Sequence, residues 1–223
     1  MKYILLVTLF CTTIVCSQND GVIGAGLKNL THDSAYTSGS WIRNFEDNSI
    51  DGSVYLFDEW NTKAIITTIN DTNLSLQKLN YDIKSDSFSA KFSHDSVYVF
   101  NNSDIKEVIL NSKRFIKLTS KNSFYECLAV GNNFKILKDY NIILTSGVKD
   151  PITQKESNSK YTQNNKYFFL NEDELINFKL KKKSILKLLK DKKDKIEVYV
   201  KNNKLSYNKE EDLIKLFNYY NTI

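Results

Sequence analysis

His94, Asp95 and Ser96 follow one another in the chain and are the residue types of a nucleophilic relay. Such a relay needs a hydroxyl, a base and an orienting acid that point at one another. Consecutive side chains in a strand or turn point in different directions, so these three do not form a relay by themselves. The sequence also lacks the GxSxG turn that presents a nucleophilic serine. We therefore interpret His94 as a turn residue and predict no catalytic residues.

A thiol nucleophile is the next possibility, and Cys127 in the run FYECLAV (124–130) is its candidate. No signature of a cysteine enzyme surrounds it, so a pair with His94 is not favoured. The alternating pattern of the run puts Cys127 on the same face as Tyr125 and Ala129. Free cysteine is among the most frequently buried residue types. We expect a buried, unreactive thiol.

Residues that hold metals or cofactors are sparse. Beyond residue 17 the chain keeps one cysteine and two histidines, His32 and His94, with no HExxH or CxxC pattern for zinc. Asp82 and Asp86 share a turn that has the carboxylates for calcium but lacks the DxDxDG spacing of a calcium loop. We interpret them as solvated turn acids. The sequence predicts no metal site and no cofactor.

Asp58 and Glu59 precede Trp60 and supply the two carboxylates that glycoside hydrolysis requires. Neighbours along a strand face opposite ways, so either carboxylate needs a partner from elsewhere in the chain. A hydrolase whose site is assembled from residues distant in sequence therefore stays open as an alternative. It requires a concave site in which two carboxylates, or His94 and a nucleophile, converge.

The elements that must position these residues are short strands. Residues 41–180 form a succession of apolar or alternating runs separated by turns rich in Asn, Asp, Ser and Gly. Turn signals at intervals of roughly 8–12 residues are typical of an antiparallel meander, sandwich or roll. Within residues 74–83 the apolar phase shifts at Lys78, so we predict a bend there. This β body should contain about ten strands.

The pattern becomes helical after Leu180, and residues 181–223 are predicted to form two or three short helices. Asn208 and Glu211 resemble a capping box, and Asp191 and Asp194 indicate the start of an earlier helix. Helices this short are marginal alone and must dock on the sheet or on a partner. Their apolar stripes comprise Leu213, Leu216, Phe217 and Tyr220 in the last helix, and Ile196, Tyr199 and Val200 in the earlier one.

Charge divides at the same boundary. Residues 179–223 carry 13 Lys and 6 acids, a net +7, whereas residues 18–178 carry 17 basic and 20 acidic groups, a net −3. One interpretation of this Lys-rich tail is attraction to an anionic envelope surface or to an acidic protein. The favoured alternative is a solvated face whose Leu and Ile stripe packs on the β body, since the six acids are interleaved with the Lys.

The N-terminus predicts export. Residues 1–17 combine Lys2 with a short apolar run, and small residues precede a cleavage point before Gln18. The run is too short for a membrane span, and no longer one follows. Ordinary cleavage is favoured over lipoprotein anchoring at Cys16, because the β-branched Val15 precedes that cysteine. The 206 residues that remain after removal of 17 from 223 suffice for one large domain or two small ones, and their Gly-rich start, residues 18–40, is predicted to be a flexible leader.

Several stretches resemble a family of uncharacterised bacterial exported proteins. They are GSVYLFDEWNTKAII (52–66), NYDIKSD (80–86), HDSVYVF (94–100) and, above all, the Lys-rich stretch 179–221. In that family a signal peptide precedes a strand-rich body and a Lys-rich helical C-terminus. The resemblance implies the same architecture here and implies no activity, ligand or catalytic residue.

These patterns predict an α+β protein: an antiparallel β meander, sandwich or roll followed by a short C-terminal helical segment. Its location is expected to be extracytoplasmic, periplasmic or secreted, where nucleic acid is an improbable target for the Lys-rich tail. The leading functional interpretation is a non-catalytic binding or structural protein of the bacterial cell envelope. The alternatives are the hydrolase described above and a carrier that holds acyl chains on the apolar face of a curved sheet.

Overall fold

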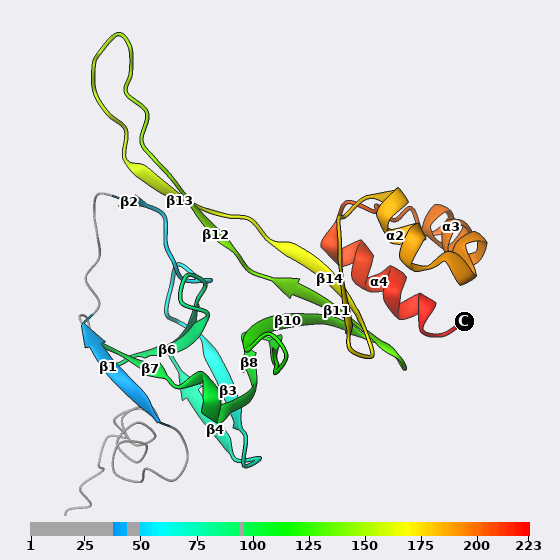
Figure 1. The fold of residues 1–223 in the computed structure, drawn as a ribbon, viewed down its shortest axis with the longest axis horizontal. Coiled ribbons are helices and arrows are strands. Elements are labelled where there is room, and N and C mark those ends of the chain that lie inside the picture. The colour runs from blue at the N-terminus through cyan, green and yellow to red at the C-terminus, as the bar shows by residue number, and fades with distance from the viewer. Residues whose placement is uncertain (1–37, 44–49, 94–95) are drawn as a thin grey trace, which may run out of the picture.

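The computed structural model of the chain describes residues 38–43, 50–93 and 96–223 (Figure 1). The predicted signal peptide and all but the end of the predicted leader lie outside the described residues. Within these ranges the α+β class is confirmed, with fifteen strands followed by three short α-helices. The strands outnumber the prediction of about ten, in part because the run at residues 74–83 divides between two sheets and a projecting arm contains strands of its own.

The first sheet is antiparallel and has the order β1-β7-β6-β5. Its first strand starts just before the predicted β body and pairs along its full length with β7. The strands of this sheet are β1 (Gly39–Arg43), β5 (Leu79–Asp82), β6 (Ser87–Lys91) and β7 (Ser96–Phe100).

The second sheet has eight strands in the order β15-β14-β11-β10-β9-β8-β3-β4. It is antiparallel. After β4 the chain forms β5 to β7 of the first sheet and returns as β8 beside β3, and after β11 it leaves as β12 (Ile142–Thr145) and β13 (Ser159–Gln163) to form the arm. A 3-10 turn, η1 (Asn102–Asp104), leads into β8. The strands are β3 (Lys63–Thr68), β4 (Asn73–Gln77), β8 (Ile105–Leu110), β9 (Lys113–Leu118), β10 (Ser123–Val130), β11 (Phe134–Asp139), β14 (Lys166–Asn171) and β15 (Glu174–Phe178).

The predicted bend at Lys78 is confirmed. Lys78 has a φ of 54° and separates β4, in the second sheet, from β5, in the first. Its N–H donates to the Thr62 carbonyl at 3.0 Å, and its own carbonyl accepts from the Lys91 N–H at 2.9 Å. The change of apolar phase in the sequence therefore marks a change of sheet.

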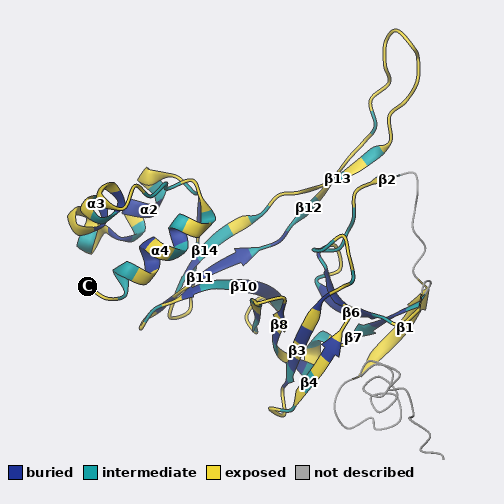
Figure 2. Ribbon diagram, turned by 180° about the vertical axis from the view of Figure 1, so that it is seen from behind, coloured by how far each residue is buried: buried dark blue, intermediate teal, exposed yellow. Residues whose placement is uncertain are grey.

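The arm projects from the β body in Figure 1. It consists of β12 (Ile142–Thr145) and β13 (Ser159–Gln163), with the short strand β2 (Ile50–Asp51) parallel to β13. Most of its residues are exposed, as Figure 2 shows.

Three helices follow β15 near the predicted boundary at residue 180. They are α2 (Lys182–Leu188), α3 (Lys193–Asn202) and α4 (Glu210–Tyr220), with the 3-10 turn η2 (Lys190–Lys192) between the first two. The predicted capping box is wrong: the N-cap of α4 is Lys209, and its side chain makes no capping bond. Instead, the carboxylate of Asp212 accepts the Ser206 N–H at 3.0 Å. Among the described residues, no helix is long and apolar enough to cross a membrane.

Two apolar cores hold the molecule together. The first fills the space between the four-stranded sheet and strands β3, β4, β8, β9 and β10, and aromatic rings dominate it. Phe88 contacts Phe124 edge-on at 5.0 Å between ring centroids, and Tyr81 contacts Phe115 at 5.2 Å. Edge-on ring pairs add stabilisation beyond the buried area alone.

The second core lies between the helices and strands β10, β11, β14 and β15. It buries the predicted stripe residues Leu213, Leu216 and Phe217 of α4 and Ile196 and Val200 of α3. Figure 2 shows the buried positions on α4 and β11. The predicted alternative for the Lys-rich tail, in which its apolar stripe packs on the β body, is therefore present.

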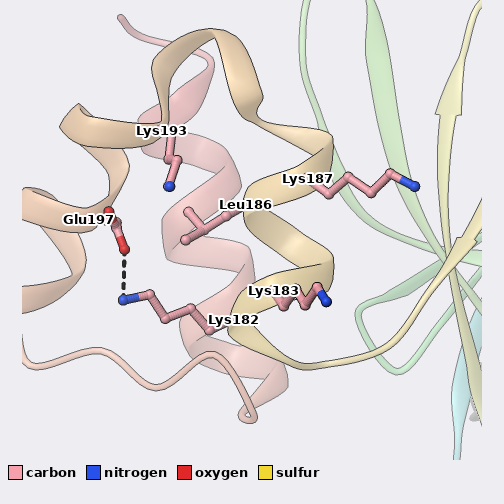
Figure 3. Close-up of a pocket in the computed structure, with 6 residues that line it drawn as sticks. All are labelled: Lys182, Lys183, Leu186, Lys187, Lys193 and Glu197. Atoms are coloured by element: carbon pink, nitrogen blue, oxygen red, sulfur yellow. Dashed lines mark ion pairs between the residues drawn. The ribbon is translucent and has the colours of Figure 1, made fainter.

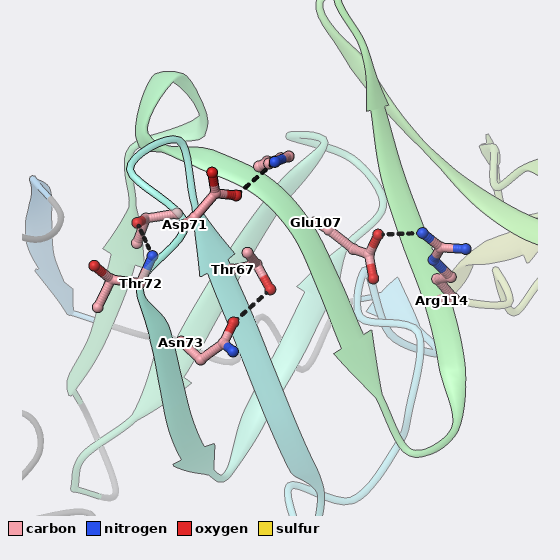
Figure 4. A network of polar contacts seen from close by, with 8 residues as sticks. Thr67, Asp71, Thr72, Asn73, Glu107 and Arg114 are labelled. Atoms are coloured by element: carbon pink, nitrogen blue, oxygen red, sulfur yellow. Dashed lines mark hydrogen bonds and ion pairs between the residues drawn. The ribbon is translucent and has the colours of Figure 1, made fainter.

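The outer face of the second sheet carries polar pairs between neighbouring strands (Figure 4). Arg114 on β9 lies 2.6 Å from Glu107 on β8, and Lys106 lies 2.5 Å from Asp71 in the β3–β4 turn. The Thr67 hydroxyl and the Asn73 side chain meet at 2.8 Å. Exposed ion pairs of this kind contribute at most ~1 kcal/mol each to the free energy of folding. They lie on the solvent-exposed face of the sheet.

Candidate functional site

The residues considered for a nucleophilic relay fall at an internal gap between two described ranges. His94 and Asp95 lie outside the described residues. Ser96 begins β7, and its hydroxyl lies 2.6 Å from that of Ser93. The interpretation of His94 as a turn residue stays a prediction.

Cys127 is half-buried rather than fully buried. The flanking residues Tyr125 and Ala129 are buried as predicted, but the pairing of β10 with β11 shifts register between Cys127 and Ala129. This bulge interrupts the alternation on which the prediction relied. Burial raises the pKa of the Cys127 thiol above its ordinary value, and Arg114 partly opposes the rise. The thiol is therefore mainly protonated at neutral pH and a weak nucleophile.

Asp82 and Asp86 have different environments. The Asp82 carboxylate accepts the N–H groups of Lys84 and Ser85, at 2.9 and 3.2 Å, as expected for a turn acid. Asp86 is bonded inward, so its interpretation as a solvated acid is wrong. Its carboxylate accepts the Tyr81 hydroxyl at 2.6 Å, the Ser123 hydroxyl at 2.5 Å and the Phe124 N–H at 3.2 Å.

Asp86 also lines a hollow of about 300 Å³ together with Asp139 and Tyr140. Burial raises the pKa of Asp139, Lys166 opposes the rise and the charge of Asp86 adds to it. Two carboxylates from distant parts of the chain thus meet in one concave site. Sequence reasoning missed Asp139, because nothing in its run marks it apart from other strand-end acids.

In the described ranges 38–43, 50–93 and 96–223, no three His, Cys, Asp or Glu side chains form a set that could hold a metal ion. The carboxylates of the hollow are therefore not part of such a set. Asp86 instead links the turn before β6 to the start of β10 through its hydrogen bonds from Ser123 and Phe124.

Asp58 and Glu59 lie in a loop before β3, not in a strand. The premise that they are neighbours along a strand is therefore wrong. Both line the same open pocket of about 610 Å³, which also includes Trp60 and Phe92. This pocket combines aromatic rings with groups of both charge signs.

A second open pocket, of about 460 Å³, lies between α2 and α3 (Figure 3). Four lysines line it, with Leu186 and one acid, Glu197. Lys182 and Glu197 form an ion pair at 2.6 Å. In Figure 3, Lys183 and Lys187 extend away from that pair. The four lysines are Lys182, Lys183, Lys187 and Lys193.

A buried ionic network joins the β body to the helices. Glu126 on β10 is 5% exposed, and it accepts the Tyr140 hydroxyl at 2.5 Å and pairs with Lys113 at 2.8 Å. Lys138, opposite Glu126 on β11, pairs with Glu210 of α4 at 2.8 Å.

Tyr167 completes the network by donating its hydroxyl to Glu210 at 2.7 Å. The Lys138 ammonium also lies 4.7 Å from the centre of the Tyr140 ring, at a cation–π distance. Burial, with the neighbouring carboxylates, raises the pKa of both Tyr140 and Tyr167. Every charge in this network has a partner, so the network holds α4 against the sheet and is a structural element rather than an open site.

Comparison of the chain with protein-family models, with curated proteins and with solved structures gives no match. The pockets and charges described above are therefore the observations that bear on the function of this protein.

Proposed function

We propose that this protein is an exported, non-catalytic binding protein of the cell envelope, and that its Lys-rich helical segment (residues 181–223) docks on an anionic envelope surface. The observation that carries the proposal is the pocket between α2 and α3, which is lined by four lysines and a single carboxylate. A cluster of like charges at an open surface is costly in isolation and is relieved when an anion binds. The signal-like residues 1–17 support an extracytoplasmic location.

The acids of the segment neutralise this cluster only in part, because Glu197 alone pairs with one of its lysines and other acids have partners elsewhere. Glu210 is bonded to Lys138 and Tyr167 of the β body. Asp212 accepts from the Ser206 N–H and pairs with Lys215, and Glu197 pairs with Lys182. Among the residues that the structure describes, ion pairs involve only Lys182 and Lys215 of the segment's lysines. A positive excess is therefore presented outward.

The helices that carry these lysines are themselves packed against the β body. Their apolar side chains are buried in the second core against β11, β14 and β15. The lysine stems are attached to helices that are already folded, so less conformational entropy is lost on binding than for a flexible basic tail. A carrier would hold acyl chains on this face of the sheet. The same packing fills that face with the chain's own side chains. Binding at the surface is accordingly preferred to the carrier alternative.

The hydrolase alternative is supported most by the hollow that Asp86 and Asp139 share, and Asp58 and Glu59 also line one pocket. A general acid and a base of this kind need oxygens free to reach the substrate. The Asp86 carboxylate already accepts three internal hydrogen bonds. Surface docking is therefore the preferred proposal.

The docking proposal is tested by sedimentation with phosphatidylglycerol vesicles and, as the neutral reference, phosphatidylcholine vesicles. A lysine near an anionic surface contributes ~1 kcal/mol, so the triple variant Lys183→Gln, Lys187→Gln, Lys193→Gln should bind about a hundredfold more weakly. Binding should also weaken as salt is raised, because salt screens exposed charges.

The matched control changes three exposed lysines of the arm, Lys149, Lys155 and Lys160, to Gln. It alters the net charge equally and should leave vesicle binding within about twofold of the unmodified protein. Equal loss in both triple variants would show that only total charge matters. No binding of the unmodified protein to phosphatidylglycerol at low salt would contradict the proposal.

A further inference from the structure

The open pocket beside Trp60 lies far from the Lys-rich segment in the sequence and has a different chemistry. It is formed by the loop before β3, by Lys78 at the bend between the sheets, and by the end of β6 with the residues that follow it. Its volume of about 610 Å³ falls within the range of ~300–1,000 Å³ typical of small-ligand pockets.

Two aromatic rings form the apolar part of this pocket. Trp60 is half-buried and is held edge-on by Tyr55, with ring centroids 4.7 Å apart. Phe92 has 47% of its surface exposed and contacts Trp41, also 47% exposed, edge-on at 5.4 Å. Large aromatic side chains held rigidly at an open surface lose little conformational entropy on binding and are typical of recognition sites.

The polar part is balanced in charge. Asp58 and Glu59 supply two carboxylates, and Lys78 and Lys91 supply two ammonium groups. The Lys91 ammonium lies 5.7 Å from the centre of the Trp60 ring, so it sits over the aromatic wall. The carboxylates accept hydrogen bonds and the ammonium groups donate them. Such a pocket matches a ligand that carries many groups able both to donate and to accept.

Three ligand classes fit poorly. A purely apolar ligand would desolvate the charged groups without replacing their hydrogen bonds, which is costly. A strongly anionic ligand, such as a phosphate, would face Asp58 and Glu59. A strongly cationic ligand would face Lys78 and Lys91. A pyranose ring satisfies both parts of the pocket, because its C–H face can stack on an aromatic ring while its hydroxyls reach the charged groups around it.

From this arrangement we propose that the pocket lined by Trp60 and Phe92 binds a neutral oligosaccharide. The sugar face stacks on the exposed Phe92 ring, beside Trp60, and its hydroxyls donate to Asp58 and Glu59 and accept from Lys78 and Lys91. This is a binding site and involves no bond cleavage. It is independent of the anionic docking proposed for the helical segment, so either can fail without the other.

The chain contains a convenient reporter, since its only two tryptophans are Trp41, which contacts Phe92, and Trp60, which lines the pocket. The test titrates the intact protein with the β-1,4-linked trimer of N-acetylglucosamine and, separately, with maltotriose, while tryptophan emission is recorded. At least one trisaccharide should shift the emission in a saturable way, with a Kd of about 1 mM or lower. Ligand-observed NMR provides a second measurement that does not depend on tryptophan.

Two variants locate the site. Phe92→Ala removes an exposed ring and should weaken binding at least tenfold, with the circular dichroism spectrum unchanged. Glu59→Gln keeps the size of the side chain and removes one charge, and it should weaken binding severalfold. The matched control is Phe168→Ala on β14, an aromatic truncation outside the pocket, which should bind like the unmodified protein.

The proposal would be overturned if neither trisaccharide bound saturably by fluorescence or NMR, or if the Phe92→Ala and Phe168→Ala variants had equal affinity. Tighter binding of inorganic phosphate than of either sugar, measured by competition, would also overturn it, because the pocket would then select anions.

Discussion

Lys138 on β11 and Lys187 on α2 show how the two regions of this molecule use the same residue type. Lys138 is 8% exposed, and its ammonium lies 2.8 Å from Glu210 and 4.7 Å from the centre of the Tyr140 ring. Lys187 is exposed and lines an open pocket with three other lysines. A buried ammonium requires partners, whereas an exposed one is solvated by water until an anion displaces that water.

The comparison extends to the cores. In the β body, aromatic rings fill the first core, while buried charges such as Glu126 lie in the network between that body and the helices. In the helical segment the buried side chains are apolar, Glu210 is bonded to the β body, and the lysines of the pocket between α2 and α3 lie at the surface. Charge therefore joins the helices to the β body at the junction, and in the proposed docking it serves recognition at the surface of the helices.

The largest expected effect tests the apolar interior of the helical segment. Phe217 on α4 is fully buried and contacts Phe134, Phe169 and Phe178. Phe217→Ala should lower the free energy of unfolding by about 4 kcal/mol, because truncation of a buried ring leaves a cavity. Urea denaturation measures this change. The control is Val198→Ala on α3, an exposed position that should change stability by under ~0.5 kcal/mol.

The next effect tests the buried charges. Glu126→Ala should lower the free energy of unfolding by about 3 kcal/mol, because it leaves Lys113 and the Tyr140 hydroxyl without their partner. Glu107→Ala removes the partner of the exposed Arg114 at the surface of the sheet and should cost less than ~1 kcal/mol. If the two substitutions cost the same, the distinction between buried and exposed pairs would be wrong.

The smallest effect tests the junction through pH. Burial acts to raise the pKa of Glu210, but hydrogen bonds from Lys138 and Tyr167 outweigh it and hold the pKa below its ordinary value. A carboxyl with a lowered pKa in the folded state stabilises that state above the unfolded pKa of ~4.3. This stabilisation is lost as pH falls from there through the folded pKa.

Glu210→Gln should therefore remove about 1 kcal/mol of stability at pH 7 and flatten the dependence of stability on pH below ~4.3. Thermal or urea denaturation between pH 7 and pH 3 measures both effects. A variant whose acid-side slope matches that of the unmodified protein would show that other carboxyls govern the junction.

Local patterns in the sequence predicted much of the architecture, for definable reasons. The shift of apolar phase at Lys78 predicted a bend, because side chains alternate strictly along a strand and a slip must be absorbed somewhere. The helical spacing of Leu213, Leu216 and Phe217 predicted the buried stripe of α4 for the same kind of reason. Both signals are local and need no knowledge of distant residues.

Contacts between distant residues were decided only by the tertiary structure. Nothing local distinguishes Asp86, which is bonded inward to Ser123 and Phe124, from a solvated turn acid such as Asp82. The bulge beside Cys127 lies where β10 pairs with β11. Cys127 is half-buried there, so the prediction of a buried thiol was wrong in degree.

The two candidate sites differ in the same way: the sequence identified one of them, and only the tertiary structure formed the other. Composition alone identified the Lys-rich segment as the cationic end of the chain, because charge needs no geometry to be counted. The bend at Lys78 sets the loop before β3 beside the end of β6. Only this placement brings Trp60 and Phe92 into one pocket. Asp58 and Glu59 line the same pocket. Long-range strand pairing and packing, rather than local propensity, determine such placement.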